Sequence, residues 1–342
     1  MRLFLARAAA ALIAFGLAAS PVWAAGSPTL ERVKKNGYLR CGTSEGLPGF
    51  AMPDNKGEWT GLDVDFCRAI AAAIFNDPKK VRFTPTSAKV RFTALQAGEF
   101  EVLSRVTTWT MSRDVQLGLE FIGVIYYDGQ GFMVPKKLNV TSAKQLGGTN
   151  VCTQTGTTTE LNLADFFRAN NMKYKVIAFE KDEETVAAYD SGRCDAHTTD
   201  QSGLYAQRLQ LKTPTDHIIL PEIISKEPLG PVVNQGDPQW ADLVRWTLFA
   251  LINAEELGVT SKNVDQMLKS TNPEVRRLLG VEGAFGEPLG LTKDWVARII
   301  KGVGNYGEMF ERNVGQGSPL KIKRGQNALW NKGGLQYAPP VR

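Results

Sequence analysis

Short runs of β-branched and aromatic residues alternate along the chain with segments in which apolar residues recur at helical spacing. In the first part of the chain this pattern predicts strands at 38–41, 81–84 and 101–104, separated by helices at 63–75 and 91–97. Phe66, Ile70 and Ile74 share one face of the first of these helices. Such a strand–helix series predicts a mainly parallel sheet with helices on its faces.

The same series recurs further along the chain. Strands are predicted at 151–154, 176–179 and 195–199, with helices at 158–170 and 183–191. A short sequence similarity between 94–101 and 188–195 supports a duplication. In both segments a helix ends at a glycine suited to the left-handed cap, and an acidic residue begins the next strand. We therefore predict an α/β protein with two similar lobes.

Two segments are candidates for crossings between these lobes. The stretch 126–131 is rich in glycine and tyrosine, and 225–231 is rich in proline and glycine. We expect lobe 1 to comprise 27–127 and 231–342, the latter including a C-terminal extension without an assigned role, and lobe 2 to comprise 128–230. The crossings are expected near 127–129 and 225–230. Two crossings form a hinge beside a cleft, where a small ligand would bind.

The amino-acid composition excludes several classes of function. The chain has 342 residues, 43% of them apolar and 22% charged, as in a globular protein. The net charge of +5 is spread along the chain and gives no reason to expect nucleic acid as a partner. With two histidines and no Cys-x-x-Cys pair, neither a His-rich zinc site nor thioredoxin-type chemistry is expected. We expect no metal and no cofactor.

The N-terminus resembles an export signal. Two arginines, Arg2 and Arg7, come before an alanine-rich apolar run at 8–19. The segment Val22-Trp23-Ala24 follows this run. We predict a signal peptide at 1–24, cleaved after Ala24, and a periplasmic protein; the alternative is a retained membrane anchor, but the run is short for that.

Export changes the expectation for the four cysteines. An even number in an oxidising compartment suggests two disulfides, and four cysteines allow three pairings. We favour Cys41–Cys67 and Cys152–Cys194, because each pair then stays within one lobe. Four buried thiols remain the alternative.

The segment 156–160 opens a predicted helix directly after a strand. Thr157 and Glu160 have the spacing of a capping box, which places Thr157 at the N-cap and leaves the amides of Thr158 and Thr159 free. The positive end of the helix would favour a carboxylate or phosphate there. An ordinary capped helix, without a ligand, is the alternative interpretation.

A second polar cluster follows the strand at 101–104. Arg113 offers a planar fork that can grip a carboxylate, and Thr108 and Thr110 offer hydroxyls and amides beside it. Asp200 ends a strand of the other lobe and could hold an ammonium group. Together Arg113 and Asp200 could hold a zwitterion across the cleft. If each residue is considered by itself, the alternative for Arg113 is an ordinary surface arginine, and the alternative for Asp200 is an aspartate that caps a helix.

Five motifs together resemble the periplasmic solute-binding proteins of polar amino acid ABC transporters, family 3, and most of all its general L-amino acid-binding subgroup. They are Gly61-Leu-Asp-Val-Asp65, Ala94-Leu-Gln-Ala-Gly98 with Glu101, Thr110-Met-Ser-Arg113, Gln154-Thr-Gly-Thr-Thr158, and Gly192-Arg-Cys-Asp195 with Thr199-Asp200. The resemblance covers roughly 29–258, and most of the tail within the subgroup.

The resemblance implies a fold, a function and roles for named residues. The fold would be the two-lobed, type II periplasmic-binding-protein fold, and the function capture of L-amino acids for an inner-membrane ABC permease, without catalysis. By resemblance Arg113 binds the α-carboxylate, Thr108 contacts carboxylate and amine, the Thr158 amide donates to the carboxylate, and Asp200 takes the α-ammonium. The alternative function is a periplasmic dehydratase on the same scaffold, with Glu45 and Lys89 as the nameable acid–base candidates. We expect a monomer.

The side-chain pocket departs from many relatives. Leu47 stands where an aromatic residue would stack on the ligand, and a second aromatic expected near Ala88 is missing. This makes specificity for basic amino acids doubtful. The residues proposed to line a roomier pocket are Glu45, Leu47, Trp59, Lys89 and Trp109; a surface or core position is the alternative for each.

Overall fold

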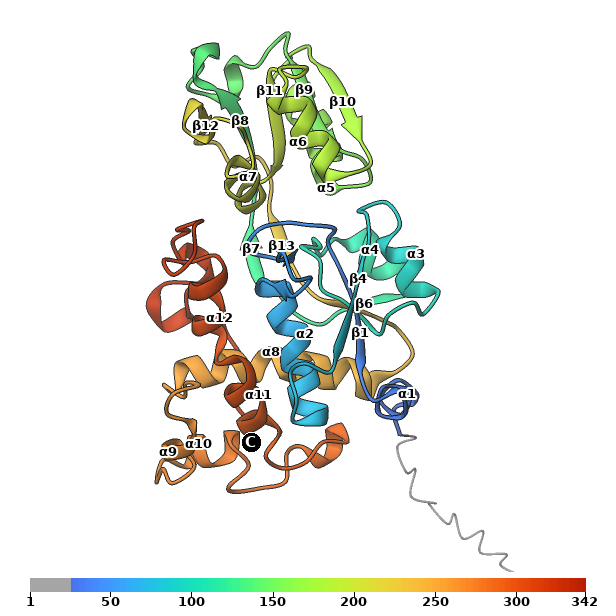
Figure 1. Ribbon diagram of the computed structural model, residues 1–342, viewed down its shortest axis with the longest axis vertical. Coiled ribbons are helices and arrows are strands. Elements are labelled where there is room, and N and C mark those ends of the chain that lie inside the picture. Colours follow the sequence, from blue (N-terminus) through green and yellow to red (C-terminus); the bar gives the residue numbers. More distant parts are fainter. Residues whose placement is uncertain (1–25) are drawn as a thin grey trace, which may run out of the picture.

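Two lobes stacked end to end form the molecule, each built on a five-stranded sheet (Figure 1). The computed structural model describes residues 26–342. The lobe 1 sheet has the order β4 (Val81–Pro85), β1 (Leu39–Thr43), β5 (Val102–Leu103), β14 (Val232–Asn234) and β6 (Leu119–Phe121). Strands β4, β1 and β5 are parallel, whereas β14 runs antiparallel to both of its neighbours.

Lobe 2 repeats this arrangement. Its sheet has the order β10 (Lys175–Phe179), β9 (Asn150–Gln154), β11 (Ala196–Asp200), β8 (Gln130–Pro135) and β12 (His217–Ile219). Again three strands are parallel, and β8 is antiparallel to both neighbours. The predicted α/β class with two similar lobes is therefore confirmed. Each sheet also contains one strand, β14 or β8, that is antiparallel to both of its neighbours, which the sequence pattern did not predict.

The four helices predicted from the apolar periodicity, at 63–75, 91–97, 158–170 and 183–191, are present within one or two residues of those bounds, and the lobes carry further helices that were not predicted. Lobe 1 carries α1 (Pro28–Asn36), α2 (Leu62–Phe75), α3 (Arg91–Gln96) and α4 (Met111–Gln116), and lobe 2 carries α5 (Thr158–Ala169), α6 (Asp182–Asp190) and α7 (Gln201–Arg208). A two-stranded ribbon of β2 (Met52–Pro53) and β3 (Trp59–Thr60) precedes α2.

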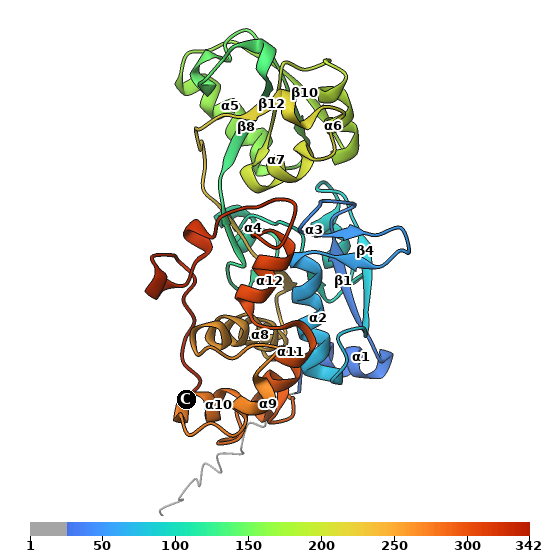
Figure 2. The same ribbon diagram turned by 60° about the vertical axis from the view of Figure 1, so that its left-hand side comes forward.

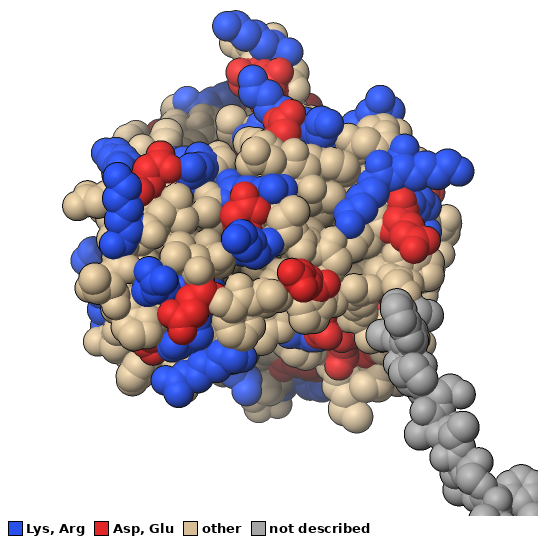
Figure 3. Space-filling view, turned by 90° about the horizontal axis from the view of Figure 1, so that it is seen from below, with Lys and Arg blue, Asp and Glu red and all other residues tan. Residues whose placement is uncertain are grey.

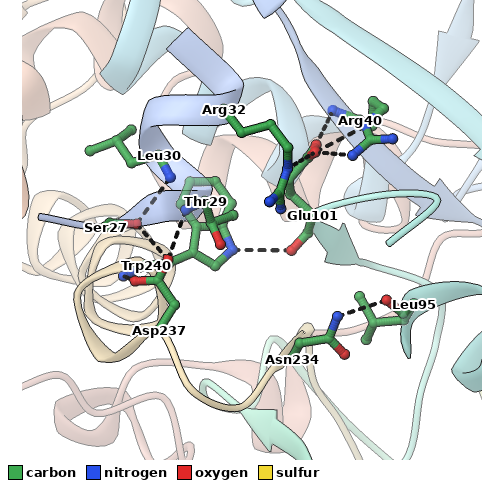
Figure 4. A network of polar contacts seen from close by, with 10 residues as sticks. All are labelled: Ser27, Thr29, Leu30, Arg32, Arg40, Leu95, Glu101, Asn234, Asp237 and Trp240. Carbon is green, nitrogen blue, oxygen red and sulfur yellow. Dashed lines mark hydrogen bonds and ion pairs between the residues drawn. The ribbon is translucent and has the colours of Figure 1, made fainter. Parts of the chain in front are cut away.

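The two similar segments, 94–101 and 188–195, make the same contact in the two lobes, between an acidic residue and the backbone of the neighbouring strand. In lobe 1 the Glu101 carboxylate accepts from the Arg40 amide at 2.9 Å, and Glu101 N donates to the Arg40 carbonyl at 3.1 Å (Figure 4). In lobe 2 the Asp195 carboxylate accepts from the Asn150 amide at 2.8 Å, and Asp195 N donates to the Asn150 carbonyl at 2.9 Å. Each acid thus ties the start of the third parallel strand to the central strand.

The hinge is a short antiparallel ladder between the two sheets. β7 (Tyr126–Asp128) carries the chain into lobe 2, and β13 (Glu227–Leu229) returns it, with Glu227 directly opposite Asp128. Figure 1 shows both strands at the waist of the molecule. The predicted fold class, two lobes joined by a two-crossing hinge, is confirmed.

After the hinge the chain completes lobe 1 and wraps around it. The buried helix α8 (Pro238–Glu256) is followed by α9 (Val264–Met267), α10 (Pro273–Leu278), α11 (Trp295–Val303) and α12 (Tyr306–Asn313). Figure 2 shows α11 and α12 alongside α2. Beyond α12 the tail returns to the hinge, where the Asn327 side chain accepts from Tyr127 N at 2.7 Å and donates to Tyr127 O at 3.0 Å.

Each lobe also contains one disulfide. Cys41–Cys67 joins β1 to α2, and Cys152–Cys194 joins β9 to the segment before β11. These are the two pairs favoured from the sequence.

The charges on the surface of lobe 1 are mixed. On the face seen from below, acidic and basic side chains are interspersed (Figure 3). None of the helices within 26–342 combines the length and the hydrophobicity needed to cross a membrane. The predicted signal peptide and its cleavage after Ala24 lie outside the described residues.

Candidate functional site

Helix α5 begins at the edge of lobe 2 that faces lobe 1. Thr157 is its N-cap, and the Thr157 hydroxyl accepts from Glu160 N at 3.2 Å. The expected return bond of the capping box is shifted by one residue: the Glu160 carboxylate accepts from Gly156 N at 3.0 Å, and Gly156 itself has a φ of 75°. Like the first amides of any α-helix, those of the first turn of α5, including Thr158 N, have no acceptor inside the helix.

The facing loop of lobe 1 is held by Asp63 at the start of α2. The Asp63 carboxylate accepts from the Ser104 hydroxyl at 2.7 Å and from Val106 N at 3.1 Å. Burial raises the pKa of Asp63 to about 6, although these two bonds oppose the shift. Val106 has a φ of 36°, a left-handed conformation that a β-branched residue adopts only under strain. The loop that leads to Thr108 and Arg113 is therefore fixed at some energetic cost.

Arg113 lies on α4, where the Thr110 hydroxyl caps the helix by accepting from Arg113 N at 3.3 Å. Its guanidinium donates to the Thr108 carbonyl at 2.9 Å and lies 5.2 Å from the centre of the Phe92 ring. Burial lowers the pKa of Arg113 to about 10, partly offset by Glu227 and Asp200, so the group stays charged at neutral pH. Among residues 26–342 it has no acidic partner at ion-pair distance.

Asp200 ends β11 in lobe 2. Its Oδ1 atom is buried and makes no hydrogen bond within the described part of the chain. Burial, together with the charges of Asp128 and Glu227, raises the pKa of Asp200 well above its usual range, and Arg113 and Arg91 act in the opposite sense. A buried carboxylate oxygen without a donor is unfavourable, and an incoming ammonium group would supply the missing donor.

Glu227, in the hinge strand β13, is a central residue that the sequence analysis missed. It is 1% exposed, and its Oε2 accepts from the hydroxyls of Thr108 at 2.6 Å and Thr158 at 2.9 Å. Its Oε1 accepts from Asn162 at 2.7 Å and Ser225 at 2.6 Å. Glu227 thereby joins Thr108 of lobe 1 to Thr158 of lobe 2, whose hydroxyls are 3.3 Å apart. The only sequence signal was an acid within a Pro/Gly-rich crossing.

A cavity of about 50 Å³ lies between the lobes, and we call it the inner cavity. Glu45, Leu47 and Arg105 line it from lobe 1, and Asp182 and Asp200 from lobe 2. A wider groove of about 530 Å³ shares Glu45 with it and also touches both lobes. The inner cavity is smaller than the roughly 300–1,000 Å³ of ordinary ligand pockets, so admitting a ligand requires the lobes to move apart.

The remaining predicted pocket residues lie elsewhere. Trp59 packs on Phe83, with ring centroids 5.9 Å apart. Trp109 stacks on Phe121 at 5.5 Å, with the rings nearly parallel. Lys89 bridges the lobes through an ion pair with Glu180 at 3.6 Å. The structure thus brings Glu45, Leu47 and Asp200 to the inner cavity and places the two tryptophans in aromatic packing.

Two buried arginines were also missed: Arg105, which lines the inner cavity, and Arg91, which shares the Phe92 ring with Arg113. Arg91 begins α3, and Arg105 follows β5. Nothing in the local sequence distinguishes them from surface arginines; only the fold buries them.

Comparison with known proteins gives consistent results. Residues 39–263 match the bacterial extracellular solute-binding proteins, family 3. The chain is 62% identical to the general L-amino acid-binding periplasmic protein AapJ of Rhizobium johnstonii over 100% of this chain and 99% of that protein. It is 53% identical to the glutamate/glutamine/aspartate/asparagine-binding protein BztA of Rhodobacter capsulatus over 95% of this chain and 97% of that one.

A solved structure is similar over nearly the same length. The ABC transporter periplasmic binding protein from Brucella ovis, with glutathione bound, is 65% identical. It superposes with a TM-score of 0.91 and covers 92% of this chain and 99% of that one.

Proposed function

Because this chain belongs to the bacterial extracellular solute-binding proteins of family 3, we propose that it captures free L-amino acids between its lobes and delivers them to the permease of an ABC transporter. The names of its relatives support this proposal, since AapJ is a general L-amino acid-binding protein and BztA binds glutamate, glutamine, aspartate and asparagine.

The observation that carries the proposal is a pair of unpaired opposite charges from the two lobes. Within residues 26–342, Arg113 has no acidic partner at ion-pair distance and Asp200 Oδ1 has no donor, and each of these two groups shifts the pKa of the other. An α-carboxylate on Arg113 and an α-ammonium on Asp200 would satisfy both groups at once. Every L-amino acid carries these two groups, whatever its side chain.

The threonines complete the proposed grip. The Thr158 amide, in the first turn of α5, donates to the α-carboxylate. The Thr108 hydroxyl gives its hydrogen to Glu227, so its free lone pair accepts from the ammonium. The Thr110 hydroxyl caps α4 and thereby positions Arg113.

Delivery follows from the hinge. A ligand that touches both lobes stabilises the closed arrangement by its greater affinity for that state, and a permease that contacts both lobes would recognise it. We further propose that the protein is exported to the periplasm by a signal peptide at 1–24, cleaved after Ala24, and that it acts as a monomer with the lobes divided at β7 and β13.

A dehydratase activity is less well supported. General acid–base catalysis needs a group with a shifted pKa, which usually requires burial. Glu45 is exposed, and Lys89 is exposed and ion-paired with Glu180. Because the relatives that match nearly the whole chain are named as binding proteins, we propose a protein that returns its ligand unchanged.

A thermal-shift panel of the twenty L-amino acids tests the proposal. A ligand present at about 100 times its Kd adds roughly 2.7 kcal/mol of stability, which is readily measured. We expect several L-amino acids to raise the melting temperature and their N-acetylated forms, which lack the ammonium, to have no effect. No shift with any amino acid would contradict the proposed function.

A further inference from the structure

Three carboxylates are gathered where the hinge meets the ligand site. Asp128 on β7 lies directly opposite Glu227 on β13 in the hinge ladder. Asp200 ends β11, where it pairs with Gln130, and Ser202, two residues further on, donates from its hydroxyl and its amide to Asp128. We call Asp128, Asp200 and Glu227 the acid cluster. If all three were ionised before a ligand binds, their charges would repel one another in a buried setting.

The members of the acid cluster are not equally satisfied as anions. Glu227 accepts four hydrogen bonds, and Asp128 accepts from the Ser202 hydroxyl and from Gly129 N at 2.9 Å. Among residues 26–342, Asp200 Oδ1 is buried without a donor, and the Asp200 side chain makes no capping bond to α7 although it stands at the N-cap. A single proton relieves both the repulsion and the buried charge, and Asp200 is the member that loses least by holding it.

Several other elements present charged or titratable groups to Asp200 or share the inner cavity with it. These groups are Tyr126 on β7, Arg91 on α3, Arg113 on α4, Arg105 after β5, Asp182 on α6 and Glu45 after β1. The α7 side chains that line the inner cavity are uncharged. Burial lowers the pKa of Arg105, and the charges of Asp182, Glu45 and Asp63 act in the opposite sense, so Arg105 is already opposed by acids of its own.

Arg91 and Arg113 favour the ionised form of Asp200, yet the opposing effects are larger. Burial, followed by the charges of Asp128 and Glu227, raises the pKa of Asp200 well above its usual range, and the two arginines only reduce this rise. Before a ligand binds, Asp200 therefore keeps a proton under conditions in which an exposed aspartate has lost it.

A histidine lies near the cavity but does not supply this proton. His197 is 1% exposed, and its Nε2 lies 2.7 Å from Oε1 of Gln207, which lines the inner cavity. Burial lowers the pKa of His197, so its imidazole is already neutral near neutral pH.

We propose that capture of an amino acid releases the proton held by the acid cluster, so that binding strengthens as the pH rises and weakens as it falls. This inference rests on the proposed function, in which Asp200 takes the α-ammonium. The ammonium donates to the Asp200 carboxylate, and the proton that Asp200 held passes to the solvent. Just below the pKa of Asp200 in the ligand-free protein, each fall of one pH unit weakens binding about tenfold, and above that pKa the affinity is independent of pH.

Isothermal titration of the mature protein with L-glutamine, whose side chain carries no titratable group, tests this coupling. Phosphate and imidazole buffers take up a released proton with different heats, so titrations in both at one pH count the protons released. At about pH 6.5 we expect about one proton per amino acid, and we expect the Kd to rise about tenfold between about pH 6.5 and 5.5.

Asp128→Asn removes one of the two neighbouring charges that keep the proton on Asp200. The variant should bind L-glutamine about three- to tenfold more tightly than the wild type at about pH 5.5 and equally at about pH 8. Asp216→Asn is the matched control, because it makes the same change at an exposed position of lobe 2. It should leave the pH profile and the number of released protons unchanged.

The outcomes separate this inference from the proposed function. Binding with equal enthalpies in the two buffers would overturn the coupling and leave the proposed function intact, and this comparison needs only the wild type. A pH profile of Asp128→Asn identical to that of the wild type would overturn the role of the acid cluster. If neither L-glutamine nor any other L-amino acid binds, the proposed function itself fails.

Discussion

The hinge residue Glu227 allows a demanding test of how the two lobes are held together. Its carboxylate accepts four hydrogen bonds, two at each oxygen, from Thr108, Thr158, Asn162 and Ser225. Glu227→Gln keeps the shape of the side chain but replaces one acceptor oxygen by an NH₂ group. Whichever oxygen is replaced, two donors lose their acceptor.

The expected loss can be worked out from these contacts. A hydrogen bond to a charged group contributes about 1.5–3 kcal/mol, so two lost bonds amount to roughly 3–6 kcal/mol. Rotation of the hydroxyls recovers part of this, and removing the charge relieves its repulsion with Asp128, directly opposite in the ladder. We expect the free energy of unfolding to fall by about 2–4 kcal/mol.

Urea unfolding followed by circular dichroism measures this change. The matched control is Glu180→Gln, the same chemical change in another contact between the lobes. The Lys89 and Glu180 side chains are 61% and 49% exposed, so that loss should stay below about 1 kcal/mol. Small-angle scattering should also show Glu227→Gln more extended than the wild type. A loss below about 1 kcal/mol for Glu227→Gln would refute the hinge role assigned to this carboxylate.

Four further predictions address the ligand grip, the strained loop, the disulfide and the buried acids. Asp200→Asn should weaken all L-amino acids about 30-fold or more in calorimetric titrations while sparing simple carboxylates; equal losses for both would contradict the ammonium role. Val106→Asn should change the free energy of unfolding in urea by less than about 1 kcal/mol, because relief of the positive φ offsets the loss of a partly buried apolar side chain from the core; a loss above about 2 kcal/mol would show that the strain is absent. Replacing Cys152 and Cys194 together by serine frees a loop with a sequence separation of 42 and should cost about 4 kcal/mol in the same assay, and an unchanged midpoint would exclude a stabilising bond. Burial raises the pKa of Asp128 from 3.8 to about 6, so ionising it in the fold costs stability as the pH rises through this range; Asp128→Asn should gain stability over the wild type at about pH 8 but not at about pH 3.5, and a gain independent of pH would disprove the linkage.

The sequence predicted most of the architecture, because helix and strand periodicities reflect local burial. It placed Asp200 at the end of β11 and Thr157 at the N-cap of α5, since both follow from turn and cap chemistry. The short strands β6 and β14 carried too few residues for a pattern, and the longer β8 carried no signal of its direction, so the antiparallel strand of each sheet was not predicted.

The site was only partly predictable, because its remaining members depend on tertiary packing. Glu227 gains its partners only when the hinge brings Thr108 and Thr158 together. Arg91 resembles a solvated residue at a helix start, yet the fold leaves it 2% exposed. Trp109 was proposed as one of several residues lining the side-chain pocket, and its ring stacks on Phe121 rather than lining the inner cavity.

The most direct test of the proposed clasp is a crystal structure of the protein grown with L-glutamate. We expect the amino acid between the lobes, its α-carboxylate receiving hydrogen bonds from the Arg113 guanidinium and its ammonium donating to the Asp200 carboxylate. A ligand whose backbone groups are held by other residues, or which lies outside the space between the lobes, would contradict the account.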